Sequence, residues 1–233
     1  MQLNIYWNEG VSKRFPQLSI SVGVIKDISV EKENAKVQEL KKILLKEMRT
    51  KYSIEKLKDN PTVRAYRDFY WMLGIDPTKT RPSGEALLRR VLHGGEIPTI
   101  STAVDSYNLA SLETIIPISG FDLDKLNLPF NVRYAENGEY FMGIGMEKPL
   151  ALTDKMLVLA DSKQVLCVYP YRDADQTKIT EQTKNVLIAG YGAPGINERQ
   201  LKEAVEKALF YIKENCHGEL GEIKVFNASS EIR

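Results

Sequence analysis

The sequence predicts an α+β fold in a single compact domain, with a hairpin-rich β core flanked by helices. Three observations predict this class. Apolar residues alternate near the start, they follow helical spacing before residue 95 and again after residue 196, and the turn residues between 130 and 170 are typical of hairpins. The chain has 233 residues, of which 43% are hydrophobic and 27% are charged. That length and mix allow one sizeable buried core and exclude global disorder.

The first part of the chain is predicted to form two strands followed by three helices. Residues 3–7 and 18–24 alternate, and the small residues of the second segment predict a strand with one buried face. From about residue 31 to residue 48 the apolar residues follow helical spacing. A second helix is expected over residues 60–74, because it begins with a capping Asn followed by Pro. A third covers residues 83–93 and ends at a Gly-Gly pair.

The second of these helices carries an aromatic face. Tyr66, Phe69 and Tyr70 are spaced so that they lie on one side of it. Such a face serves either as a platform for stacking nucleic-acid bases or as part of the core. The helical spacing favours core packing.

The middle of the chain is predicted to contain two hairpins. Residues 130–135 and 140–144 flank the turn Glu-Asn-Gly-Glu, and Asn-Gly is the strongest short hairpin signal. Residues 156–160 and 165–169 flank a second polar turn. A single closing helix is then expected over residues 196–215, where the apolar face is unbroken.

A glycine motif precedes this last helix. Residues Gly190–Gly195 match the pattern G-x-G-x-x-G and follow a short apolar strand over residues 186–189. Pro194 has no N–H to offer a pyrophosphate, and the remaining chain is too short for a dinucleotide-binding domain. We interpret the motif as a strand-to-helix connection and expect no nucleotide cofactor.

The content of charged residues, cysteine and histidine limits the kinds of function that the chain can have. The net charge is +1, which excludes nucleic-acid binding by bulk charge but not by a local basic patch. Cys167 and Cys216 are too few for a disulfide framework, and Cys167 is expected to be a buried thiol. His93 and His217 do not form a metal-binding spacing, so no metal is expected. Without a signal-like start or a long apolar run, we expect a cytoplasmic protein with no membrane segment.

Two polar segments stand out. The first covers residues 79–85 and leads into Arg89 and Arg90, and the second covers residues 169–175 and leads into Lys178. Each concentrates arginine, hydroxyl and carboxylate groups at the edge of a regular element. Such clusters bind polar ligands through bidentate hydrogen bonds, or they form structural salt-bridge networks. The residues alone favour neither interpretation.

The first segment, with the motifs that follow it in order, resembles the B3/B4 domain of the phenylalanyl-tRNA synthetase β subunit, in the form seen in free-standing relatives. The motifs are R-P-S-G-E-A-L-L-R-R from residue 81, I-P-T-I from 97, V-D-S-Y-N from 104, P-I-S-G-F-D-L from 117 and Y-R-D-A-D-Q-T-K from 171. The resemblance covers a core of about residues 79–190. Residues 1–78 would then be an N-terminal strand and helix extension.

The resemblance implies an editing-type site, which in the synthetase hydrolyses tyrosine wrongly attached to phenylalanine tRNA. Ester hydrolysis needs a positioned water and donors for the developing oxyanion. The candidate catalytic residues are therefore Asn108, Ser119, Arg172 and Asp173. The candidate RNA-binding residues are Lys79, Arg81, Arg89, Arg90 and Lys178. The implied partner is tRNA or aminoacyl-tRNA, and no cofactor is implied. Arg81, Asn108, Ser119 and Arg172 are expected to approach one cavity.

The sequence also departs from the synthetase pattern. Ser119 stands where the bacterial synthetase has His, and Tyr107 stands where it has Thr. The editing glutamate falls near Ile188 or Ala189, and no carboxylate is found there. Three functions therefore stay open. They are an aminoacyl-tRNA deacylase, a non-catalytic RNA-binding or regulatory module that uses the cleft for a small polar ligand, and an unrelated small-molecule enzyme on the same scaffold.

Overall fold

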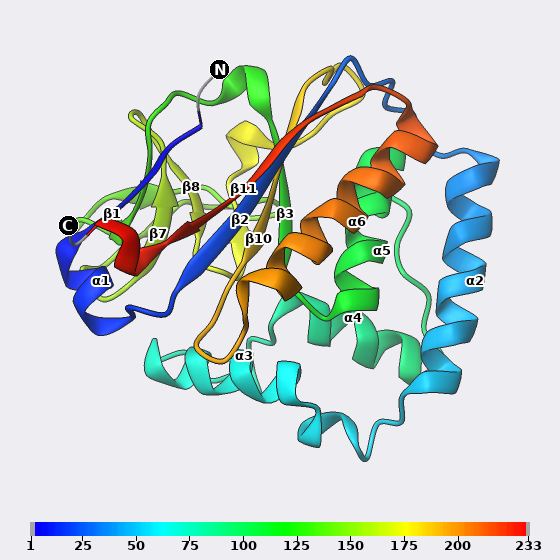
Figure 1. Cartoon of the computed structure of the whole chain (residues 1–233), viewed down its shortest axis with the longest axis horizontal. Helices are drawn as coiled ribbons and strands as arrows, with labels where there is room; N and C mark the ends of the chain where they lie inside the picture. Colours follow the sequence, from blue (N-terminus) through cyan, green and yellow to red (C-terminus); the bar gives the residue numbers. More distant parts are fainter. Residues whose placement is uncertain (1–2, 232–233) are drawn as a thin grey trace.

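The molecule is arranged in three layers, two of them β-sheets and the third helical. A computed structural model describes residues 3–231. Figure 1 shows a four-stranded sheet running through the middle, a second sheet on one side of it and a group of helices on the other. A further helix runs along the lower edge of the view in Figure 1. The predicted α+β class is confirmed.

The central sheet consists of four antiparallel strands in the order β11-β2-β10-β3. Their bounds are β2 Ser19–Lys26, β3 Ile118–Asp122, β10 Val186–Tyr191 and β11 Glu219–Asn227. The prediction of one buried face for β2 is wrong, because Ser21 on the other face is also fully buried. The small residues let the helical layer approach closely. A side chain at Gly23 would collide with Leu209 and Val205.

The second sheet has five strands in the order β1-β4-β7-β8-β9. Their bounds are β1 Ile5–Trp7, β4 Phe130–Tyr134, β7 Leu157–Ala160, β8 Val165–Val168 and β9 Arg172–Asp173. β1 and β4 are parallel, and the other neighbours are antiparallel. The second predicted hairpin is confirmed as β7–β8. Its turn is fixed by Asp161, whose Oδ1 accepts from the backbone N–H groups of Lys163 (2.7 Å) and Gln164 (2.9 Å).

The first predicted hairpin is wrong in its strand pairing. Its turn forms, with the N–H of Glu139 donating to the Glu136 carbonyl at 3.1 Å and with Gly138 at a φ of 83°. The following strand, β5 (Tyr140–Phe141), pairs instead with β6 (Leu150–Ala151). β4 cannot take β5 as a neighbour because β1 and β7 occupy both of its edges.

The helices include two that the sequence did not predict. Their bounds are α1 Glu9–Arg14, α2 Ala35–Lys51, α3 Pro61–Met72, α4 Ser83–Leu92, α5 Thr102–Thr114 and α6 Glu198–Cys216. Short 3₁₀ turns cover η1 Leu57–Asp59, η2 Leu123–Lys125, η3 Asp175–Thr177 and η4 Ala228–Glu231. The four predicted helices correspond to α2, α3, α4 and α6. The helices α1 and α5 were missed, the first because it is short and the second because it is buried on nearly all sides.

The last strand, β11, was also missed. It forms one edge of the central sheet, and its register against β2 shifts between Leu220 and Ile223. Gly221 and the charged side chains of Glu222 and Lys224 interrupt the apolar alternation of this strand. Glycine and charge are common on edge strands, where they weaken the sequence signal for a strand.

Burial confirms two of the sequence-based expectations. Tyr66, Phe69 and Tyr70 are fully buried, so the aromatic face of α3 packs into the core. Cys167 and Cys216 are buried free thiols. Within residues 3–231, the helices are too short or too polar to cross a membrane.

Candidate functional site

The candidate site forms where β3 of the central sheet faces β9 of the second sheet. Ser119 lies in β3, and its hydroxyl donates to Oδ1 of Asp173 in β9 at 2.5 Å. Ser119 is 5% exposed, so the hydrogen bond is largely shielded from water. A hydrogen bond to a charged group in such a place is stronger than an exposed one.

The environment of Asp173 makes its carboxyl group titrate near neutral pH. Burial raises the pKa of Asp173 to about 7, and the hydrogen bond from Ser119 offsets part of this effect. Asp173 is paired with Cys167 in the register between β8 and β9. Burial, and then the charge of Asp173, raise the pKa of the Cys167 thiol. Cys167 is therefore a neutral thiol at physiological pH and a poor nucleophile.

Two buried tyrosines complete the surroundings of this carboxyl group. Burial and the nearby Cys167 and Asp173 raise the pKa of Tyr191, which ends β10. Burial and then Asp173 also raise the pKa of Tyr107 in α5. The ring of Tyr107 packs against the backbone of β3, since a side chain at Gly120 would come within 2.7 Å of it. Ser119 and Asp173 therefore lie among neutral phenol and thiol groups.

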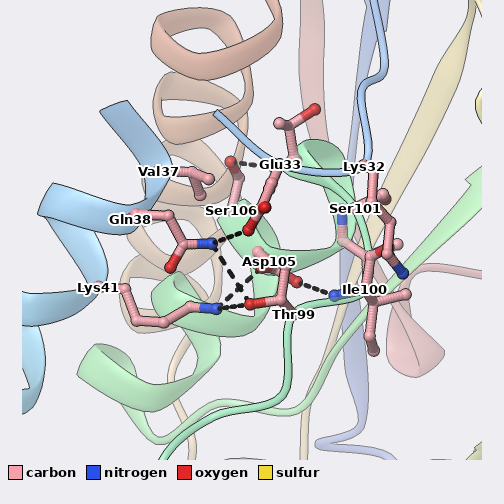
Figure 2. Close-up of polar contacts among 12 residues, drawn as sticks. Lys32, Glu33, Val37, Gln38, Lys41, Thr99, Ile100, Ser101, Asp105 and Ser106 are labelled. Carbon is pink, nitrogen blue, oxygen red and sulfur yellow. Dashed lines mark hydrogen bonds and ion pairs between the residues drawn. The ribbon is translucent and has the colours of Figure 1, made fainter. Parts of the chain in front are cut away.

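A buried ion pair holds the beginning of α5, the helix that carries Tyr107. Figure 2 shows Nζ of Lys41 from α2 contacting Oδ2 of Asp105 at 3.0 Å and Oγ1 of Thr99 at the same distance. The other carboxylate oxygen of Asp105 accepts from the Ile100 backbone N–H at 2.9 Å. Lys41 is 4% exposed and Asp105 is fully buried. This pair fixes α5 to α2 and so positions the residues that follow in α5.

Asn108 and Arg172 do not join the Ser119–Asp173 pair. Asn108 in α5 is half-buried, and its side chain makes no hydrogen bond to the described residues. Arg172 precedes Asp173 in an extended strand, so its side chain leaves the opposite face. It is exposed, and its Nη1 donates to the Ile144 carbonyl at 3.2 Å.

The candidate RNA-binding residues are distributed over several elements. Lys79 and Arg81 are exposed in the loop between α3 and α4. In α4, Arg89 lies 3.9 Å from Glu85, and Nε of Arg90 donates to the Glu96 carbonyl at 2.6 Å. Lys178 pairs with Asp175 at 2.8 Å. The cavity predicted to unite Arg81, Asn108, Ser119 and Arg172 stays a prediction.

Sequence reasoning placed Glu85 in a polar segment without assigning it a role and did not mention Lys41, although both are buried charges. Two nitrogens of Arg67 donate to the two carboxylate oxygens of Glu85 at 2.8 and 2.5 Å, which ties α3 to α4. An acidic residue in the first turn of a helix is too common to mark a buried charge. Only the contact of each residue with its partner on another helix identifies it as a buried charge.

The glycine motif joins β10 to α6. A side chain at Gly190 would lie 3.0 Å from Val205, and one at Gly192 would lie 2.5 Å from the Ser19 carbonyl oxygen. Close packing of backbone against neighbouring elements therefore explains these glycines. The described residues also contain no group of three or more His, Cys, Asp or Glu arranged to hold a metal ion.

These features define an α+β domain with two facing sheets and a hydrogen-bonded, partly buried Ser–Asp pair between them. Residues 65–217 match the B3/4 domain family, and the chain belongs to that family.

Relatives of the chain are synthetase subunits. It is 28% identical over 159 residues to the phenylalanine–tRNA ligase β subunit of Neisseria gonorrhoeae, which covers 58% of this chain and 20% of that protein. It is 36% identical over 121 residues to the corresponding subunit of Carboxydothermus hydrogenoformans, covering 51% of this chain and 15% of that protein. The match thus spans only 15–20% of the length of these relatives.

One solved structure shares the fold. It is an N-terminal fragment of the phenylalanyl-tRNA synthetase β subunit from Pyrococcus horikoshii, with a TM-score of 0.52 and 14% sequence identity. The similarity covers 94% of this chain and 50% of the other. At this identity the likeness concerns the fold.

Proposed function

We propose that this protein binds the aminoacyl end of tRNA and hydrolyses the ester of a wrongly attached amino acid. The observation that carries the proposal is the Asp173 carboxyl group, which is partly buried where the two sheets face each other and accepts a hydrogen bond from Ser119. Membership of the B3/4 family and the relation to synthetase β subunits support tRNA as the partner. An anionic carboxylate in this place suits the α-ammonium group that every aminoacyl ester carries.

The Ser119–Asp173 pair offers no activated protein nucleophile for attack on the ester. The thiol of Cys167 stays protonated. The Ser119 hydroxyl donates its hydrogen bond to a carboxylate, and no histidine among the described residues is bonded to it that could activate it as a nucleophile. The attacking group is then water. Its oxygen bonds to the ester carbonyl carbon, the bond to the ribose oxygen breaks, and a proton passes to that oxygen. The neighbouring ribose hydroxyl of the tRNA orients the water, while Asp173, held by the hydrogen bond from Ser119, binds the amino acid and Asn108 donates to the carbonyl oxygen.

A deacylation screen over a panel of mischarged tRNAs tests this function. We expect wild-type protein to release at least one amino acid, and we expect Asp173→Asn or Ser119→Ala to slow the release at least about 10-fold. Cys167→Ala is expected to keep the rate within a few-fold, and exposed His93→Ala serves as the matched control. Loss of activity in Cys167→Ala with an intact fold would indicate covalent catalysis instead.

A second function is favoured by one specific observation. Within the described residues, no hydrogen bond or ion pair joins the side chains of Asn108 and Arg172 to the Ser119–Asp173 pair, and Ser119 is nearly closed to solvent. This arrangement suits a non-catalytic RNA-binding or regulatory module. Binding of tRNA without release of any amino acid across the panel would select that alternative.

A further inference from the structure

The C-terminal end of α3 exposes a large aromatic side chain. Trp71 is 57% exposed and the adjacent Met72 is 49% exposed. The other tryptophan of the chain, Trp7, is only 6% exposed. The remaining aromatic residues of α3 are fully buried, so core packing accounts for them but not for Trp71. An exposed tryptophan with apolar company is a feature of binding surfaces.

The stretch of sequence that contains this tryptophan is rich in positive charge. Residues 61–92 contain six Lys and Arg against three Asp and Glu, a net charge of +3, which leaves −2 for the rest of the chain. Arg64, two helical turns before Trp71, and Arg81, in the loop after α3, are both exposed and form no ion pair within residues 3–231. Lys79 in the same loop is also exposed, and its charge helps lower the pKa of Asp76.

This surface is connected to the candidate site. The ring of Phe69 in α3 meets the ring of Tyr169 edge-on with their centroids 6.1 Å apart, so the end of α3 lies beside the segment that leads to Asp173. The bidentate contact between Arg67 and Glu85 holds α3 against the beginning of α4. A polymer bound at Trp71 could therefore extend from this helix toward β9.

We infer that Trp71 stacks on an unpaired base of single-stranded RNA, whose phosphates are bound by Arg64, Lys79 and Arg81. An exposed indole beside unpaired basic groups fits a polyanion that carries flat apolar rings, because stacking and phosphate contacts then act together. A protein partner would need no such match between ring and positive charge. The inference rests on the proposed function and deepens it by naming the residue that contacts the tRNA end.

Intrinsic fluorescence makes the test direct, because Trp71 is the exposed one of the two tryptophans. Wild-type protein titrated with a short single-stranded oligoribonucleotide should show quenching, and Trp71→Ala should abolish it. Trp71→Ala should also bind the same RNA about 5- to 100-fold more weakly in a separate binding assay, and Trp71→Phe should recover part of the affinity. Phe210→Ala is the matched control, since Phe210 is 54% exposed on α6 beside Glu203 and Glu206.

The outcomes separate this inference from the proposed function. Stacking would be supported if Trp71→Ala loses the quenching and binds the RNA more weakly than wild-type protein, while Phe210→Ala does not. If wild-type protein binds the RNA without quenching, and Trp71→Ala binds it equally well, stacking is overturned while tRNA binding stands. If wild-type protein binds neither the oligoribonucleotide nor tRNA, the RNA partner itself is overturned for both proposals.

Discussion

At the scale of single residues, the partly buried carboxyl group of Asp173 links folding to pH. Its pKa rises from an ordinary 3.8 to about 7 on folding, mainly through burial. Between these values the folded state holds a proton that the unfolded state has lost, so the free energy of unfolding should fall as pH rises from about 4 to about 7 and then level off. Asp173→Asn should remove this contribution, which denaturant unfolding of both proteins at about pH 5 and about pH 8 would measure.

A matched substitution isolates this effect from the titration of other carboxylates. Asp154 is exposed in the loop before β7, so Asp154→Asn should leave the pH dependence of wild-type protein unchanged. If Asp173→Asn loses stability with pH in parallel with wild-type protein, the carboxyl group is ionised in the folded state across this range. That result would also remove the basis for a titrating site.

At the scale of elements, what the sequence could predict depended on how each element is buried. The helices α2, α3 and α6 each bury one face, and their apolar spacing was readable. In α5 ten of thirteen residues are buried, so no periodic stripe distinguishes the helix from a strand-rich region. The turn at Gly138 was readable from local residues, whereas the partners of β4 lie more than twenty residues away and are not encoded locally.

The ion pair between α2 and α5 leads to a prediction about stability. Lys41→Met would leave the Asp105 carboxylate buried without its cation, and breaking such a pair costs about 3–5 kcal/mol. Asp105→Asn in the same protein would remove the unpaired charge and keep an oxygen for the Ile100 N–H. We therefore expect the double variant to be more stable than Lys41→Met alone, as measured by chemical denaturation.

Lys42 provides the comparison for this cycle because it is exposed on the same helix. Lys42→Met should change the free energy of unfolding by less than about 0.5 kcal/mol. A double variant less stable than Lys41→Met would mean that Asp105 acts through hydrogen bonds alone, and that its charge contributes nothing to joining the helices.

At the scale of the whole molecule, the candidate site depends on long-range packing. The family resemblance named both Ser119 and Asp173, but their contact arises only when the two sheets face each other across 54 residues of sequence. Successive side chains of a strand point to opposite faces of the sheet, so Arg172 and Asp173 of β9 lie on different faces although they are adjacent in sequence. Lys41 carried no local signal, and the polar segment that contains Glu85 did not show its role, because Asp105 and Arg67 come from other helices.

The uneven distribution of charge predicts how the proposed binding of tRNA should respond to salt. The total charge of +1 gives no general attraction, so phosphate contacts should come from the basic stretch at residues 61–92. Each contact contributes about 0.7–0.9 to the slope of log affinity against log salt concentration. Changing both Lys79 and Arg81 to Gln should therefore reduce the slope by about 1.4–1.8. Arg89 and Arg90 should contribute less, because Glu85 and the Glu96 carbonyl already engage them.

Filter binding of tRNA over a range of salt concentrations would measure these slopes. The control changes Arg199 and Lys202 to Gln, because both lie exposed on α6 and pair with acidic neighbours on the same helix. It removes the same two charges from the chain, so an effect of net charge alone would appear equally in both double variants. If the slope of log affinity against log salt is smaller only for the variant changed at Lys79 and Arg81, the phosphate contacts belong to the loop between α3 and α4. Equal slopes in all three proteins would place the tRNA on another face of the molecule.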